Sequence, residues 1–116
     1  MYLPGSLYSF QDVITTPTPL SVSNRVAYVC KGSSLLTFTL PATSLAGFSF
    51  RVIGKTCNWK IQQNANQKIT VGTLTSNTGV TGSISSTFAT DQIEVTCFLA
   101  NTEYQATTIW GNITVI

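Results

Sequence analysis

The stretch DQIEVTCFLANTEYQATTIW, residues 91–110, decides the fold class. In its first half an apolar side chain recurs at every second position: Ile93, Val95, Cys97 and Leu99. This alternation is typical of a half-buried β-strand, because successive side chains of a strand point to opposite faces. Asn101 and Thr102 then form a turn, and residues 104–110 run back. We therefore expect a β-hairpin, with Glu94 and Glu103 opposite each other on its solvent-facing side.

The same period of two continues outward from this hairpin along most of the chain. Further strands are predicted at 26–30, 35–40, 48–53, 59–62, 69–71 and 113–116. No stretch places apolar residues at helical spacing over three turns, and turn residues separate the strands. The prediction is an all-β protein: an antiparallel β-sandwich or jelly-roll-like domain of about eight short strands over residues 20–116, with a small barrel as the other closed arrangement.

The two tryptophans fall on the inward side of their strands by alternation. Trp59 is in phase with Ile61, and Trp110 continues the series through Tyr104, Ala106 and Thr108. We expect both in the core. The alternative is an exposed aromatic platform for a glycan, to which Tyr28 and Tyr104 would also contribute.

Residues 72–87 (GTLTSNTGVTGSISST) carry no charge and are rich in Gly, Ser and Thr. A hairpin with its turn near residues 77–82 is expected here. The alternative is a long flexible loop, a feature that compact domains rarely keep without a function.

The composition removes most catalytic chemistry. Only 9% of the residues are charged, histidine is absent, and the four carboxylates are Asp12, Asp91, Glu94 and Glu103. General acid–base catalysis at neutral pH depends on histidine or on carboxylates with shifted pKa values. We predict that the protein is not an enzyme and that it has no catalytic, cofactor-binding or metal-binding residues.

The three cysteines Cys30, Cys57 and Cys97 fit no zinc-binding spacing. Buried free thiols are expected, and one disulfide with a third free thiol is the alternative. The six cations are spread along the chain and give a formal net charge of only +2, so no nucleic-acid partner is predicted. No apolar stretch approaches the roughly 18–20 residues that cross a bilayer, so no membrane association is predicted either.

The first 19 residues differ from the rest in having aromatics, three prolines and little periodicity. We interpret residues 1–19 as a docking arm that reaches another chain, with packing on its own domain as the alternative. The partner-binding residues of this arm are its large apolar side chains: Tyr2, Leu3, Leu7, Tyr8 and Phe10. Low charge and a small core also favour association of the chain with copies of itself.

Several short motifs follow one another along the chain and together carry a resemblance to a known family. They include LPAT at 40–43, GK at 54–55, WKI at 59–61, QNA at 63–65 and GNITV at 111–115. With these motifs, residues 35–116 resemble a module of bacteriophage tail-fibre, capsid-decoration and other virion-surface structural proteins. The chain departs from that module at Cys57-Asn58, which replaces a Gly-Gly pair, and at Lys68–Gly72, which replaces Thr-Ile-His-Phe-Gly.

The resemblance implies a structural protein of the phage virion. Because the module here follows only a short apolar arm, we expect a capsid decoration (cement) protein on the capsid exterior. It would act as a homotrimer bound to the major capsid protein or another virion protein. The alternative is a receptor- or glycan-binding module of a tail fibre or spike, with a host glycan as its partner. A general extracellular adhesion domain is a third interpretation.

Overall fold

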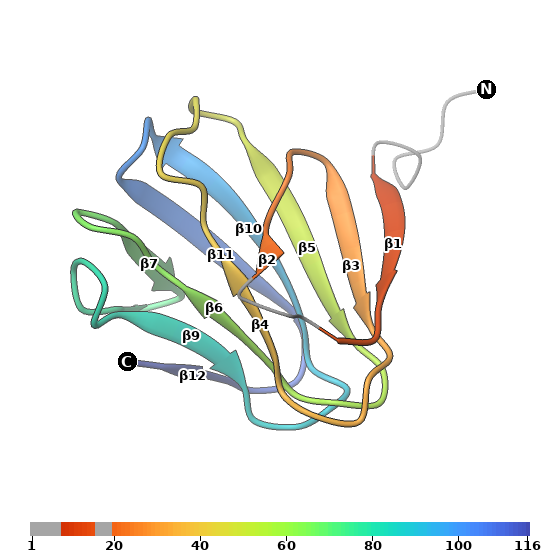
Figure 1. Ribbon diagram of the computed structural model, residues 1–116. Helices are drawn as coiled ribbons and strands as arrows, with labels where there is room; N and C mark the ends of the chain where they lie inside the picture. The colour runs from red at the N-terminus through yellow and green to blue at the C-terminus, as the bar shows by residue number, and fades with distance from the viewer. Residues whose placement is uncertain (1–7, 16–19) are drawn as a thin grey trace.

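The computed structural model describes residues 8–15 and 20–116. Within these two ranges the chain forms twelve strands and no helix (Figure 1). The all-β prediction is confirmed, with more strands than expected. Their bounds are β1 (Ser9–Val13), β2 (Leu20–Ser21), β3 (Val26–Cys30), β4 (Leu36–Thr39), β5 (Ser49–Gly54), β6 (Trp59–Gln62), β7 (Lys68–Val71), β8 (Leu74–Thr75), β9 (Ser83–Ser86), β10 (Gln92–Leu99), β11 (Glu103–Trp110) and β12 (Ile113–Val115).

The strands form two sheets that face each other across one hydrophobic core (Figure 1). One sheet has seven strands in the order β1-β3-β5-β10-β11-β7-β8, and the other has five in the order β12-β9-β6-β4-β2. The five-stranded sheet covers one face of the seven-stranded sheet. The opposite face of the seven-stranded sheet is called the outer face below.

In its first half the chain crosses from one sheet to the other after every strand. β1, β3 and β5 are neighbours in the seven-stranded sheet, and β2, β4 and β6 are neighbours in the other. Neighbours within each set run parallel, as do β7 and β11. The remaining pairs, including the β10–β11 hairpin, are antiparallel. The pairing is therefore mixed rather than antiparallel throughout, because side-chain alternation in one strand does not reveal the direction of its neighbour.

The core consists of the side chains that alternation directs inward. Phe50 on β5 and Val95 on β10 are paired across the two strands, are fully buried, and belong to the same hydrophobic cluster as Phe38 and Ile61 of the other sheet. Trp59 is also fully buried, as predicted, and its Nε1 donates to the carbonyl oxygen of Asp91 at 2.9 Å. A buried indole needs such an acceptor, since an unsatisfied N–H in the core costs stability.

The described part of residues 1–19 belongs to the sandwich. β1 runs parallel to β3, and Val13 at its end lies in the core. β2 then contributes to the five-stranded sheet before β3 begins. The expectation that the sheets start near Val26 is therefore corrected, because Ser9–Val13 completes the edge of a sheet instead of leaving it. Tyr2, Leu3 and Leu7 lie outside the described residues.

Residues 72–87 do not form the expected hairpin. β8 pairs with β7 in the seven-stranded sheet, whereas β9 pairs with β6 and β12 in the five-stranded sheet. The intervening residues are a crossing between layers. Their Gly- and Ser-rich composition suits both kinds of connection, so the sequence alone did not separate them.

A buried amide holds this crossing in place. Nε2 of Gln63 donates to the carbonyl oxygens of Gln67 at 2.6 Å, Asn77 at 2.9 Å and Gly79 at 3.0 Å. Its Oε1 accepts a hydrogen bond from the Ser76 hydroxyl. Because each of these polar groups is satisfied inside the protein, the connection gains defined geometry without regular secondary structure.

Candidate functional site

The two glutamates of the β10–β11 hairpin do not form a pair. Glu94 lies opposite Thr107, and Glu103 lies opposite Leu99 near the turn. The expectation that the two carboxylates face each other is corrected, because residues 94 and 103 are offset along the two strands. No pair of carboxylates at this hairpin therefore has the arrangement across a cleft that glycoside hydrolysis uses.

Glu94 is instead the centre of a polar cluster on the outer face. Its Oε2 accepts hydrogen bonds from the Tyr8 hydroxyl at 2.6 Å and from Arg51 Nε at 3.0 Å. The Tyr8 hydroxyl also lies 2.9 Å from Ser49 Oγ, and Arg51 Cζ lies 4.4 Å from the centroid of the Tyr8 ring. The cluster ties β5 and β10 to the residue that precedes β1.

The cluster keeps Glu94 ionised. Partial burial acts to raise the pKa of this carboxyl, but the hydrogen bonds from Tyr8 and Arg51, with the charges of Arg51 and Arg25, lower its pKa below the ordinary value. A carboxylate with a lowered pKa accepts hydrogen bonds at neutral pH and does not donate a proton.

Tyr8 and Phe10, two of the predicted partner-binding residues, have different environments. Tyr8 is buried in the cluster just described, so this side chain packs on its own domain, as in the alternative interpretation of the arm. Its role in partner binding stays a prediction. Phe10, two residues later on the edge strand β1, is 64% exposed. Of the two side chains, only that of Phe10 is exposed.

Trp110 is 66% exposed, so the prediction that it lies in the core is wrong. A β-bulge explains the error. Ile93 pairs with Thr108, but the preceding residue Gln92 pairs with Trp110, so Ile109 is an extra residue on β11. One extra residue reverses the side-chain phase of the strand beyond it, which moves Trp110 from the core side to the outer face.

The bulge places Trp110 at the end of a cross-strand row on the outer face. The row runs from Trp110 to Gln92 on β10, then to Ile53 on β5 and Val29 on β3. Only about half of β11 has a second neighbour, since β7 pairs with it from Glu103 to Ala106. The part from 107 to 110 has a free edge as far as the described residues show.

A second exposed apolar group lies at the other end of the sandwich, where two loops meet (Figure 1). We call it the apolar tip: Leu45 (81% exposed), Phe98 (72%) and Leu99 (54%). Ser44 N donates to Asn101 Oδ1 at 2.7 Å, and Asn101 N donates to the Ser44 carbonyl at 3.0 Å. These bonds fix the loops, and neither 41–47 nor 97–102 contains a charged residue.

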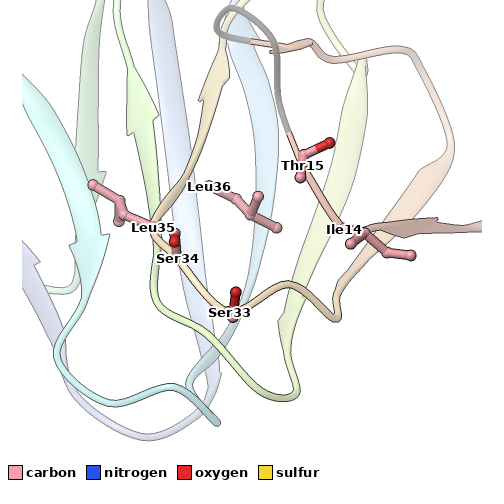
Figure 2. Close-up of a pocket in the computed structure, with 6 residues that line it drawn as sticks. All are labelled: Ile14, Thr15, Ser33, Ser34, Leu35 and Leu36. Carbon is pink, nitrogen blue, oxygen red and sulfur yellow. The ribbon is translucent and has the colours of Figure 1, made fainter.

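A shallow pocket of about 190 Å³ lies between the end of β1 and the loop before β4 (Figure 2). Figure 2 shows Ile14 and Thr15 on one side, and Ser33 and Ser34 on the segment that leads to Leu36. Its lining offers hydroxyl groups and aliphatic carbons without a charged side chain.

The cysteines are free and buried, as predicted. Burial, and to a lesser degree the proximity of Cys57, raises the pKa of the Cys30 thiol to about 12. Such a thiol stays protonated at neutral pH and is a poor nucleophile or metal ligand. Across the described ranges no three His, Cys, Asp or Glu side chains are grouped to hold a metal ion.

Comparison with protein-family models gives no match, and comparison with curated protein sequences gives none either. Over the part of the chain that the structure covers, no helix has the length and apolar character needed to cross a membrane.

Proposed function

We propose that this chain is a structural protein of the bacteriophage virion surface, and within that class a capsid decoration protein. The resemblance of residues 35–116 to virion-surface modules supports the class. The apolar tip is the observation that supports the narrower proposal, a capsid decoration protein. Three large uncharged side chains held in water by hydrogen-bonded loops favour a surface that is covered in the working assembly.

The proposed mechanism is burial of apolar surface between neighbouring subunits on the capsid exterior. The chain would associate as a homotrimer and bind the major capsid protein or another virion protein. Leu45, Phe98 and Leu99 would supply contact area at little entropic cost, since the loops that carry them are already fixed. The edge strands β1 and β12 offer backbone groups for pairing across subunit boundaries.

Light scattering and binding to phage capsids test this proposal together. The purified chain should run as a trimer and should coat capsids that lack it, as seen by electron microscopy. Replacing Leu45 and Phe98 together by Ser should weaken trimer formation or capsid binding at least tenfold. The control is Gln105→Ser, an exposed polar position on β11. A wild-type chain that stays monomeric at micromolar concentration and ignores capsids contradicts the proposal.

Trp110 favours a second candidate, a receptor- or glycan-binding module of a tail fibre or spike. An exposed tryptophan on a sheet face leaves a large apolar area in water, which is unfavourable in free energy unless another molecule packs on it. This candidate predicts binding to host cells or glycans and labelling of the tail, not of the capsid, by antibody in electron micrographs.

A further inference from the structure

The outer face around Trp110 combines an aromatic surface with hydrogen-bonding groups. Gln92 lies directly opposite Trp110 on β10. One row along the same two strands, Glu94 lies opposite Thr107. Arg51 on β5 lies next to Glu94 in that row and donates to it. Rows on one face are separated by two residues, about 7 Å, and neighbouring strands by about 4.8 Å.

From this geometry we propose that the outer face at Trp110, Gln92, Thr107, Glu94 and Arg51 is a carbohydrate-binding site. Its ligand would be a neutral oligosaccharide with one pyranose ring stacked on Trp110. The inference rests on the second candidate function and names its ligand class and its site.

The indole of Trp110 suits the apolar side of a sugar ring. A pyranose presents C–H groups on its face and hydroxyls around its rim, so it needs an apolar plane bordered by polar groups. Trp110 supplies the plane, with two-thirds of its surface exposed. The half-buried Ile53, beyond Gln92 in the same row, extends the apolar floor.

The polar neighbours match the rim of the ring. The Gln92 amide and the Thr107 hydroxyl can each donate and accept hydrogen bonds, as sugar hydroxyls do. Glu94 adds an acceptor and Arg51 adds donors, and both side chains are about one-third exposed. These two charges are paired with each other at 3.0 Å, and the cation of Arg25 lies by the Tyr8 ring, next to Ser49 on the side away from Trp110. The five residues of the site therefore carry no net charge, which favours neutral over acidic sugars.

The site is held rigid before any ligand binds. Tyr8 fixes Glu94 through its hydroxyl. Beyond Trp110, Gly111 has a positive φ of 96° and packs so tightly on Asp91 that a Cβ there would collide with the carboxylate. The Asp91 carboxylate is itself fixed by the backbone N–H of Thr87 at 2.8 Å. A ligand would therefore lose little affinity to ordering of the protein.

The test is an array of neutral and sialylated oligosaccharides probed with the full-length chain. We expect binding to a subset of the neutral glycans. Trp110→Ala should reduce that binding at least tenfold, Trp110→Phe should keep part of it, and Gln92→Ala should weaken it. Val80→Ala is the control, since it removes an exposed apolar side chain from the crossing between β8 and β9, outside both proposed surfaces, and should leave binding unchanged.

Fluorescence gives an independent measure. Trp59 and Trp110 are the two tryptophans, and Trp59 is fully buried, so acrylamide quenching of tryptophan emission in the free protein should report on Trp110. A neutral glycan that binds on the array should protect the protein from quenching, and Trp110→Ala should lack both quenching and protection.

The outcomes separate the site from the function. Glycan binding that survives Trp110→Ala, or binding to sialylated glycans alone, overturns the proposed site while the glycan-binding function stands. Absence of any glycan binding overturns both. A change from oligomer to monomer in Trp110→Ala also overturns the site, because it assigns Trp110 to a subunit interface.

Discussion

Trp59 and Trp110 are the only tryptophans of the chain, and they occupy opposite environments. Trp59 lies in the core with its indole N–H satisfied by a backbone carbonyl, whereas Trp110 lies on the outer face. Two side chains of one type thus have different roles in the same molecule. One is buried in the core, and the other is exposed to solvent on the outer face.

Substitution by alanine should separate these two roles. Trp59→Ala should lower the free energy of unfolding by about 3–5 kcal/mol, since it leaves a large cavity and removes buried area. Trp110→Ala should change it by less than about 0.5 kcal/mol, as for most exposed positions. Urea denaturation of both variants measures the difference. Comparable losses in the two variants would contradict the exposed position of Trp110.

Sequence alternation predicted Trp59 correctly and failed at Trp110 for a specific physical reason. The period of two assigns a face to each residue only while the register with the neighbouring strand is unbroken. The extra residue Ile109 breaks that register, and nothing in the letters TTIWG distinguishes a bulge from a regular strand. The prediction for the two glutamates failed for another reason. With the turn at Asn101 and Thr102, Glu103 lies beside the turn and Glu94 lies several residues away from it, so the two residues could not be opposite each other.

At the scale of elements, β1 shows how an irregular sequence can still complete a sheet. It forms a parallel edge with β3 although it lacks the alternation seen in β10, because only Val13 among its residues reaches the core. The remaining four side chains are exposed. An edge strand with a single core residue shows little alternation of apolar and polar side chains. For this reason the sequence of the segment was interpreted as an arm.

Two charge insertions on β1 test whether it is a strand or an arm. Val13→Asp should lower the free energy of unfolding by about 3–5 kcal/mol, because it places an unpaired carboxylate in the core. Phe10→Asp, three residues earlier on an exposed position, should change it by less than about 0.5 kcal/mol. Thermal unfolding followed by circular dichroism compares them. An equally small effect of both substitutions would mean that the segment does not pack on the sandwich in solution.

The Gln63 network is the second feature of this scale. Gln63→Leu keeps the volume of the side chain but leaves the carbonyls of Gln67, Asn77 and Gly79 without their shared donor. We expect a loss of about 1–3 kcal/mol in the free energy of unfolding. Gln105→Leu, on an exposed part of β11, is the matched control and should be close to neutral. Hydrogen exchange should show faster opening of residues 76–82 in Gln63→Leu alone.

Most strands were predictable because each has its own alternation, but their partners were not. The sequence indicated residues 26–30, 59–62 and 113–116 as strands, and β3, β6 and β12 lie there. It did not indicate which of them share a sheet. Strand pairing depends on which connections cross from one sheet to the other and which stay in the same sheet. Glycine- and serine-rich segments such as 72–87 permit both a crossing and a hairpin.

At the scale of the whole molecule, the Glu94 cluster links acidity to stability. The pKa of Glu94 is lowered in the folded state, so its ionisation stabilises the fold above the ordinary pKa of 4.5. That contribution is lost as the pH falls through the lowered pKa. Wild type should therefore be more stable than Glu94→Gln at pH 7, and the difference should shrink below pH 4.5. Urea titrations from neutral to strongly acidic pH measure this trend.

Two further variants attribute the effect. Tyr8→Phe and Arg51→Gln each remove one of the two donors to Glu94. In either background, the stability lost on Glu94→Gln substitution should therefore be smaller and less dependent on pH. A loss that is constant over the whole pH range would contradict the assigned environment of Glu94.

The crossing of the first six strands between the sheets has a consequence for the order in which the protein folds. Neighbours such as β1 and β3, or β3 and β5, meet only after a strand of the other sheet has been laid down between them. The β10–β11 hairpin joins eight-residue strands through a short turn and has a much smaller loop-closure cost. We therefore expect this hairpin, with β5 against it, to form the folding nucleus.

Val95→Ala should slow refolding, with a kinetic φ-value of about 0.5–0.8, whereas Val13→Ala should mainly speed unfolding, with a φ-value of about 0–0.3. Stopped-flow chevron plots measure both φ-values. Equal φ-values would mean that the parallel strands β1 to β6 assemble together with the hairpin.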